Sequence, residues 1–575
     1  MSFLLWLDAA PPRFWTLCFV SLGALLASAC APAFQERASG RLPGTALHLL
    51  RQPITFVILG ALAILAFRWP ALFFPWLLDH DEAQMGAQAI KYFTDFVPWR
   101  SVDGTTSGPL NSWWLMVPGI LGWGISWMSI RLMGLICVFA TFCFTYGTFR
   151  RISGEAIARV AVLPLAFFYL FVTSISFLHY TSEHVPVMLI SGGFYFAARL
   201  AHGDAATMKS LIPAAVLFGA VPFAKLQATP IGALGGILLL TILIGKTKRA
   251  GRDRTPACEL AAWAMAGASV PVLFFFLVLN GRALADFWIS YVGQLTTYKQ
   301  IGHAGGSLSG LLWEDRQVIA LVIAGAVAGM VLLGVAWKRR RLWRIPAVWT
   351  FVYIGVALFC VLWSGKHHPH YFLFLVHPIC LCLGLLTAAT RKQAPDGATE
   401  SRAAGISPWL LIAPVLAVQL SQLVAVVPGH PHIGNLPAYR EPPSDPLVRA
   451  IRQVSNPGDR LTVWGLTPSL HVDTGLAPGT RDAITQMQIL PSSRQEYYRE
   501  RFLNDLKATR PKVFVDTDSP YLMMDGGSFA PYVMLPAHGH EVFPRLAAFI
   551  AGNYEKVYEA RIGRTKHVIR VYSRQ

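Results

Sequence analysis

Residues 53–78, PITFVILGALAILAFRWPALFFPWLL, run directly into Asp79-His80-Asp81-Glu82, so a long apolar stretch ends abruptly in a cluster of acids. A run of this length exceeds the roughly 20 residues that a helix needs to cross a bilayer. Comparable runs lie at 14–34, 258–279, 317–337, 345–363, 371–390 and 408–427. Helices that stay apolar on every face for so long are typical of membrane spans rather than of a soluble core.

The composition also indicates a membrane protein. Hydrophobic residues make up 54% of the 575 residues and charged residues only 14%, against about 25% charged in a soluble domain. The net charge of +18 could indicate nucleic-acid binding, but the basic residues lie in short clusters between apolar runs, as in cytoplasmic loops. Nearly all of the eight cysteines lie in or beside those runs, so no disulfides are expected. The clusters are Arg37/Arg41/Arg51, Arg150/Arg151, Lys246 to Arg254, Lys338 to Arg344 and Arg391/Lys392/Arg402.

Placing the basic clusters on the cytoplasmic side predicts an α-helical polytopic membrane protein with about 12 transmembrane helices. Residues 1–52 are expected to form an extra N-terminal helix, retained rather than cleaved as a signal peptide, and a cytoplasmic loop. Residues 53–427 are expected to form the transmembrane catalytic module, with outside loops at 79–112 and 280–316.

The segment 428–575 differs from the rest because it has no spanning run and is richer in proline and charged residues. Short β-rich segments alternate there with helical stretches, which predicts a small extracytoplasmic α/β domain. The predicted strands are Arg460–Trp464, Lys512–Asp516 and His567–Tyr572, and a helix is predicted over Ser493–Ala508.

The acidic cluster Asp79, Asp81 and Glu82 is the first candidate for chemistry. Three carboxylates in four residues at a membrane surface must be solvated, paired or used. One of them could accept a proton from an acceptor hydroxyl that attacks an anomeric carbon. The alternative is a polar helix boundary, with Asp79 as N-cap and Glu82 at the capping-box position. The two interpretations are compatible.

A second candidate, Lys225, interrupts the apolar segment 211–245, with Pro222, Gln227 and Pro230 beside it. A lysine at the bilayer centre costs about 2.5–3.5 kcal/mol, so we expect two helices with Lys225 at an outer turn. There it could contact a phosphate, or it could be a snorkelling lysine.

A third candidate is the segment Ser364 to Tyr371, which holds His367, His368 and His370. Its side chains could contact a phosphate or a sugar, or could simply be polar residues at the membrane interface. Zinc is disfavoured because the histidines lack i,i+4 spacing and no cysteine or carboxylate is near in sequence.

The segment Asp81-Glu82-Ala-x-x-Gly follows an early helix and precedes Ser107-Gly108-Pro109-Leu110 and a tryptophan-rich stretch. In this the chain resembles the GT-C glycosyltransferases. More narrowly, it resembles the branch of protein O-mannosyltransferases, the lipid A aminoarabinose transferase and the rhizobial lipopolysaccharide sugar transferases. It extends over about residues 53–390 and depends on the order and common outer location of short motifs. The extra N-terminal helix departs from the usual pattern.

The resemblance implies an inverting glycosyltransferase that moves one hexose or pentose from a polyprenyl-phosphate donor to an envelope glycan such as lipopolysaccharide, a lipid or a protein, on the periplasmic face. It implies a multi-pass protein of a bacterial inner membrane without a cofactor; a divalent metal is possible but is not predicted. Asp79-x-Asp81 also fits a pattern that holds a metal and a nucleotide sugar, but those donors are cytoplasmic and this loop is predicted outside. The implied catalytic residues are Asp81 as the base with Asp79, Glu82 and Glu183, and the implied donor contacts are Lys225, Gln227, His368, His370 and Tyr371.

Two other functions stay open. A flippase or secondary transporter would keep ionisable residues near the membrane midplane in two related halves, whereas here the polar residues collect at one face and no duplicated half is evident. A ligase or polymerase that transfers a whole lipid-linked glycan would share the predicted topology. The expected partners are therefore a lipid-linked donor, an envelope acceptor and membrane lipids, without nucleic acid.

Overall fold

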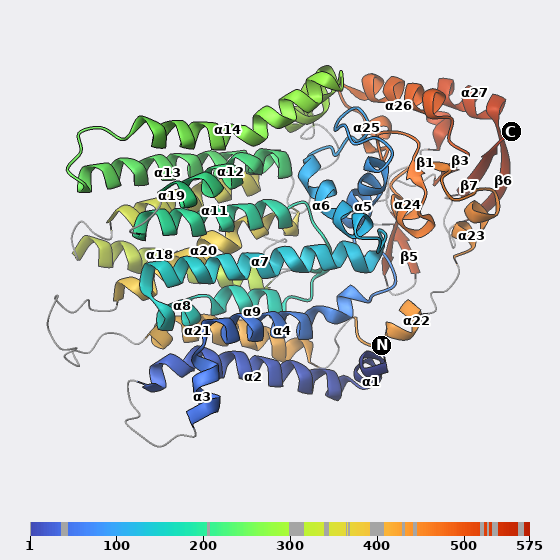
Figure 1. The fold of residues 1–575 in the computed structure, drawn as a ribbon. Coiled ribbons are helices and arrows are strands. Elements are labelled where there is room, and N and C mark those ends of the chain that lie inside the picture. Colours follow the sequence, from blue (N-terminus) through green and yellow to red (C-terminus); the bar gives the residue numbers. More distant parts are fainter. Residues whose placement is uncertain are drawn as a thin grey trace.

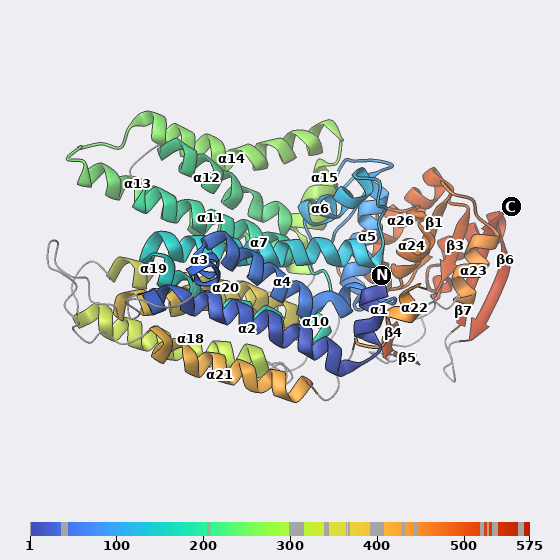
Figure 2. The same cartoon turned by 60° about the horizontal axis from the view of Figure 1, so that its bottom comes forward.

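The computed structural model describes residues 2–35, 44–203, 207–297, 316–338, 344–363, 365, 368–390, 408–427, 432–440, 445–517, 522–525, 528–531, 539–561 and 568–575. A long helical bundle occupies one part of the molecule, and a small α/β domain covers one of its ends (Figure 1). Figure 2 shows the same arrangement after rotation, with the N-terminus beside the α/β domain. Asp8 makes that contact, since its carboxylate accepts hydrogen bonds from the backbone of Gly434 and Leu436 at 2.8 and 2.9 Å.

Eight helices among the described residues are long and apolar enough to cross a membrane. Two shorter apolar stretches lie in α18 (Arg316–Lys338) and α21 (Pro408–Val426). The polytopic helical class is confirmed, but the expected number of about 12 spans is not. The spans lie in α2 (Pro11–Gln35), α4 (Pro53–Leu72), α7 (Trp127–Ser153), α12 (Thr207–Ala224), η1 (Leu226–Ala228) with α13 (Thr229–Arg249), α14 (Ala257–Asn280), α19 (Arg344–Trp363) and η4 (Pro369–Phe372) with α20 (Leu373–Thr390).

Part of the difference in count lies between residues 155 and 178. This apolar stretch is divided into α8 (Glu155–Ala161), α9 (Leu163–Phe171) and α10 (Ile175–Leu178). Pro164 lies in the first turn of α9, where a helix needs no backbone N–H. Because proline lacks this N–H, the preceding helix α8 cannot continue through it. The helix α11 (His184–His202) then returns through the bundle and packs against α7 and α12.

Basic residues lie at the end of the bundle opposite the α/β domain. Arg150 and Arg151 stand in the last turn of α7, and Lys246 and Arg249 in the last turn of α13. Both helices end far from the α/β domain (Figure 1). The remaining predicted basic clusters lie largely outside the described residues, as does the second half of the predicted loop 280–316.

The extra N-terminal helix is built into the bundle. The guanidinium of Arg159 on α8 is fully buried and pairs with Glu155 at 2.6 Å. It also donates to the carbonyls of Ser28 on α2 and Leu50 on α3 (Gly44–Arg51), both at 2.7 Å. A buried cation with this many acceptors ties the three helices to one another.

The α/β domain has a five-stranded sheet in the order β2-β1-β3-β7-β6. The strands β1 (Arg460–Trp464), β2 (Ala477–Pro478) and β3 (Val513–Asp516) are parallel, and β7 (Val568–Arg574) runs antiparallel between β3 and β6 (Tyr554–Arg561). Strands β1, β3 and β7 agree with the predicted strands, and α26 (Gln495–Thr509) agrees with the predicted helix.

Both faces of this sheet are covered, as the alternation of side chains along β3 requires. Phe514 packs with α26 and α27 (Pro544–Asn553), and Val513 and Val515 pack with α23 (Pro446–Gln453) and α24 (Ser469–Thr474) on the other face.

The remaining elements are α1 (Ser2–Asp8), α5 (His80–Tyr92), α6 (Pro109–Ile120), α15 (Leu284–Asp286), η2 (Phe287–Val292), α16 (Gln294–Thr297), α22 (Leu436–Arg440), α25 (Gln486–Ile489), β4 (Leu522–Asp525), β5 (Ser528–Pro531) and η5 (His540–Val542).

Candidate active site

The acidic segment begins α5, at the end of the bundle that the α/β domain covers (Figure 1). Asp79 is the N-cap, and its carboxylate accepts a hydrogen bond from the backbone N–H of Asp81 at 2.9 Å. The expected helix boundary is therefore present. Glu82 does not complete a capping box, because it accepts instead from the N–H of Leu78 at 2.8 Å, one residue before the cap.

Glu82 is fully buried and paired with Arg131 of α7. The guanidinium donates to both carboxylate oxygens, at 2.6 and 3.1 Å, and also to the carbonyl of Trp76 at 2.5 Å. This pair fixes the turn between α4 and α5. Since both oxygens of Glu82 are engaged, this geometry suits a residue that holds Asp79 and Asp81 in place rather than one that orients an acceptor.

Asp79 and Asp81 each face a histidine. Asp79 Oδ1 lies 3.8 Å from His179 Nε2, and Asp81 Oδ2 lies 3.6 Å from His370 Nε2. The side chain of Asp81 is 37% exposed, which makes it the most open carboxylate of the cluster. Asp81 is therefore more accessible to a ligand than Asp79, whose side chain is 23% exposed.

The two carboxyl groups have pKa values displaced in opposite directions. Burial and the neighbouring Asp79 raise the pKa of Asp81, although His370 works against this. Burial also acts to raise the pKa of Asp79, but His179 and His80 outweigh it and hold that pKa below its ordinary value. Two adjacent acids with divided pKa values suit a pair in which one stays ionised and the other exchanges a proton.

Lys225 lies in the connection between α12 and η1, as expected, and its ammonium is buried. It pairs with Glu183 Oε1 at 2.8 Å, donates to Ser182 Oγ at 2.5 Å and stands 5.1 Å from the centre of the Tyr371 ring. Burial would raise the pKa of Glu183, but Lys225 more than offsets it and lowers the pKa to about 2. Glu183 is therefore an anion that holds Lys225 in position.

The histidine segment lies directly before α20 and places its side chains beside Lys225 and Asp81. His370 and Tyr371 lie in η4, which leads into α20, and the rings of His368 and His370 stack at 5.3 Å. Burial, together with the neighbouring His370, lowers the pKa of His368 to about 3, so its imidazole is neutral at physiological pH. The apolar window of this helix is entirely buried in the bundle, which gives these side chains a fixed base.

Gln227 does not share this arrangement. Its side-chain amide donates to the carbonyl of Cys360 on α19, so it joins η1 to that helix. Of the other eight predicted residues, Glu82 has a structural role and seven form one cluster. The cluster contains Asp79, Asp81, Glu183, Lys225, His368, His370 and Tyr371.

The predicted loop 79–112 closes over Lys225. Ser107 forms an antiparallel backbone bridge with Lys225, and the N–H of Gly108 donates to the carbonyl of Ala224 at 2.9 Å. A Cβ at Gly108 would lie 2.1 Å from the carbonyl oxygen of Phe223, so only glycine permits this approach. The Ser-Gly-Pro-Leu motif therefore makes this close backbone contact possible.

Sequence reasoning missed His179 as a member of the site. Its ring stands at right angles to that of His370, with centroids 6.1 Å apart. Ligand atoms of Asp81, His179 and His370 all lie within 4.8 Å of one another, so these three side chains could hold a divalent cation. Spacing along the chain gave no sign of this, because the three residues come from three separate segments. The expectation of a metal-free site stays a prediction.

No protein-family model matches the sequence, and no curated protein sequence is similar to it. The solved structures do provide a match. ArnT from Cupriavidus metallidurans bound to undecaprenyl phosphate superimposes with a TM-score of 0.53 and 14% identity, over 90% of this chain and 98% of that chain. The same enzyme in the apo state gives a TM-score of 0.53 and 16% identity over the same shares.

The chain has the fold of ArnT. The expected GT-C fold is thereby confirmed. A weaker similarity, with a TM-score of 0.41 and 12% identity, covers 88% of this chain and 80% of the oligosaccharyltransferase of Archaeoglobus fulgidus in its apo form.

Proposed function

We propose that this protein is a membrane glycosyltransferase that takes a single sugar from a polyprenyl-phosphate donor and transfers it to an envelope glycan, lipid or protein. The observation that carries the proposal is the open carboxylate of Asp81 in one cluster with the buried cation Lys225. A glycosyl transfer from a lipid phosphate needs these two groups, a base for the acceptor and a cation for the leaving phosphate. The undecaprenyl phosphate bound to ArnT, which shares the fold, supports this donor class.

Asp81 is the proposed base. As the acceptor oxygen forms its bond to the anomeric carbon, its proton passes to the Asp81 carboxylate. The bond from that carbon to the phosphate oxygen breaks, and the polyprenyl phosphate leaves as an anion. Attack from the side opposite the phosphate inverts the anomeric centre. The raised pKa of Asp81 makes it a stronger base than an ordinary aspartate.

Lys225 is the proposed phosphate contact. An ammonium has three N–H donors, and Glu183 and Ser182 take two of them. The third meets no acceptor among the described residues and could donate to a donor oxygen. The charge would stabilise the phosphate most when the bond to the sugar is breaking. His370 and Tyr371 stand beside Lys225 and would contact the same phosphate. The proposed location is the periplasmic face of a bacterial inner membrane.

The proposal is tested with purified protein in liposomes and a synthetic polyprenyl-phosphate sugar, together with mass spectrometry of envelope glycans from cells with and without the protein. We expect one defined hexose or pentose to be missing without it. The matched control for Asp81→Asn in this assay is Asp253→Asn. It changes an exposed carboxylate in the connection between α13 and α14, at the opposite end of the bundle. Movement of a labelled lipid without sugar transfer would show a flippase instead, and transfer of a whole glycan would show a ligase.

A further inference from the structure

The segment between α5 and α6 carries unusual backbone strain. Four non-glycine residues of the described chain have a positive φ, and two of them, Trp99 at 59° and Thr105 at 55°, lie in this segment. Such conformations cost about 1–3 kcal/mol each and persist only where the surroundings hold them. Residues 99–105 must therefore be held by contacts with their surroundings.

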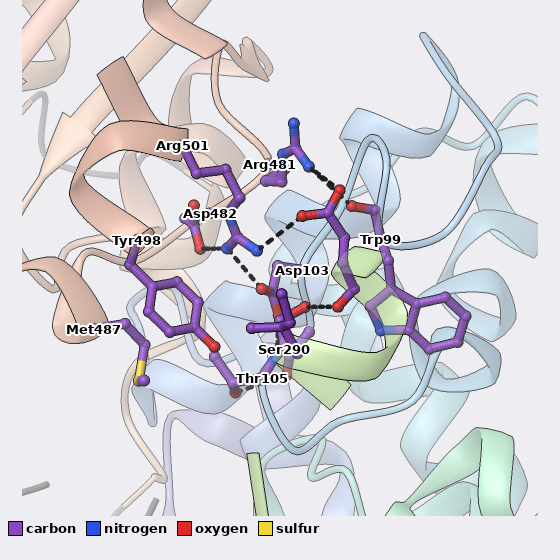
Figure 3. A network of polar contacts seen from close by, with 12 residues as sticks. Trp99, Asp103, Thr105, Ser290, Arg481, Asp482, Met487, Tyr498 and Arg501 are labelled. Atoms are coloured by element: carbon purple, nitrogen blue, oxygen red, sulfur yellow. Dashed lines mark hydrogen bonds and ion pairs between the residues drawn. The ribbon is translucent and has the colours of Figure 1, made fainter. Parts of the chain in front are cut away.

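The α/β domain supplies the contacts. Arg501 of α26 places one nitrogen 2.6 Å from Asp103 Oδ2 and 2.6 Å from Asp482 Oδ1 (Figure 3). The side chains of Arg501 and Asp103 are only 5% and 1% exposed. One buried guanidinium thus joins the strained segment to the α/β domain.

A second arginine holds the same segment. Arg481 donates to the carbonyl of Trp99 at 3.3 Å, and its own carbonyl accepts from the N–H of Asp103 at 2.9 Å. Its guanidinium is bound to Asp286 of α15 and to Asp505 of α26, at 2.9 and 2.8 Å. The backbone of Trp99 and that of Asp103, two residues before Thr105, are therefore held by a residue of the α/β domain.

This segment leads directly to the proposed donor contact. Asp103 Oδ1 accepts from the N–H of Thr105 at 2.8 Å, and the carbonyl of Gly104 accepts from the N–H of Ser107 at 2.9 Å. Ser107 in turn forms the backbone bridge with Lys225. A continuous chain of short contacts thus runs from Arg501 through Asp103 to the backbone of Lys225.

We propose that Arg501 is a positioning residue for sugar transfer, which acts through Asp103 and the strained segment 99–105 to set the location of Lys225. The inference rests on the proposed function, in which Lys225 binds the donor phosphate. It assigns to the α/β domain a part in arranging the donor site, although none of that domain's described residues contributes a side chain to the cluster around Asp81.

The variant that tests this is Arg501→Met, with Arg545→Met as the control, because Arg545 is an exposed arginine of the same domain paired with Glu500. Hydrogen exchange of intact protein in detergent should become faster in residues 99–108 with Arg501→Met and stay unchanged with the control. The kcat/KM for the donor should fall by about 10²-fold, the loss expected from a small misplacement remote from the chemistry. Arg501→Lys, which keeps the charge without the planar fork, should give an intermediate loss.

The triple variant Arg501→Met, Asp103→Asn, Asp482→Asn distinguishes positioning of Lys225 from a role in stability alone. It removes the charges of all three side chains, so none of them is left buried without its partner. Thermal stability should recover in it while exchange in 99–108 stays fast and the donor KM stays high. Wild-type exchange and wild-type kcat/KM in folded Arg501→Met would overturn the inference. If the wild-type protein transfers no sugar, the proposed function fails, whereas the exchange experiment still decides whether Arg501 holds the segment.

Discussion

Carboxylates meet cationic or histidine side chains in two regions of this molecule, and the regions differ in how completely the carboxylates are engaged. Asp103 is 1% exposed and lies 2.6 Å from Arg501, whereas Asp81 is 37% exposed and lies 3.6 Å from His370. A buried carboxylate with both oxygens engaged, such as Asp103, fixes a backbone, whereas a loosely paired, open carboxylate can accept a proton. Glu82 belongs with Asp103 on this criterion, although it is the sequence neighbour of Asp81.

The largest expected effect separates Asp81 from its neighbours. Asp81→Asn keeps the shape of the side chain and removes the proton acceptor, so transfer should fall by about 10²–10⁴-fold while donor binding survives. The measurement is kcat in the liposome assay, with donor affinity determined separately. Full activity in this variant would break the distinction between the two regions and leave Asp79 as the candidate base.

The next effect concerns stability. Glu82→Gln leaves Arg131 as a buried cation without its anion, which should cost about 3–5 kcal/mol of unfolding free energy. Asp95→Asn is the matched control, because Asp95 pairs with Arg100 in an exposed ion pair and should cost less than about 1 kcal/mol. Thermal unfolding in detergent reports both. A Glu82→Gln protein that is stable but inactive would move Glu82 to the chemical side of the comparison.

A smaller effect is expected at the cation. Lys225→Ala removes one charged hydrogen bond to the donor phosphate, worth about 1.5–3 kcal/mol, so the donor Kd should rise by roughly 10- to 100-fold. Lys225→Arg should recover part of this, since the charge stays and the geometry changes. Unchanged donor affinity in Lys225→Ala would place the phosphate nearer to His370 and Tyr371.

The smallest effect is a shift along the pH axis. The base must be ionised, so kcat/KM should fall as the pH drops through the raised pKa of Asp81. Asp79→Asn removes a neighbour that raises this pKa, so the acid limb should move to lower pH. His370→Gln removes a neighbour that lowers it, so the limb should move to higher pH. Profiles that coincide for all three proteins would show that Asp81 is not the titrating group.

Local patterns in the sequence predicted much of this arrangement. The apolar runs gave the bundle, the Pro-rich interruption gave the turn at Lys225, and Asp79 was expected as a helix cap. The strands β1, β3 and β7 followed from short β-rich segments. Each of these features is decided by residues close together in the chain.

Pairings between distant residues were not predicted. Glu82 and Arg131 stand 49 residues apart, and Asp103 and Arg501 stand 398 apart, so no spacing rule connects them. His179 became a neighbour of His370 only because α10 and η4 pack together. A carboxylate looks the same in sequence whether a distant arginine saturates it or leaves it open.

The central helix α20 has a consequence for how the protein responds to its membrane. All of its apolar window is enclosed by protein, whereas only 17% of the corresponding window of α14 is. Thinning or thickening of the lipid bilayer acts on helices that touch acyl chains, by tilting them. Such a change reaches α14 directly but meets no surface of α20. The position of His370 and Tyr371 along the bundle is therefore set by the protein, and we expect the proposed donor site to keep its depth when the lipid composition changes.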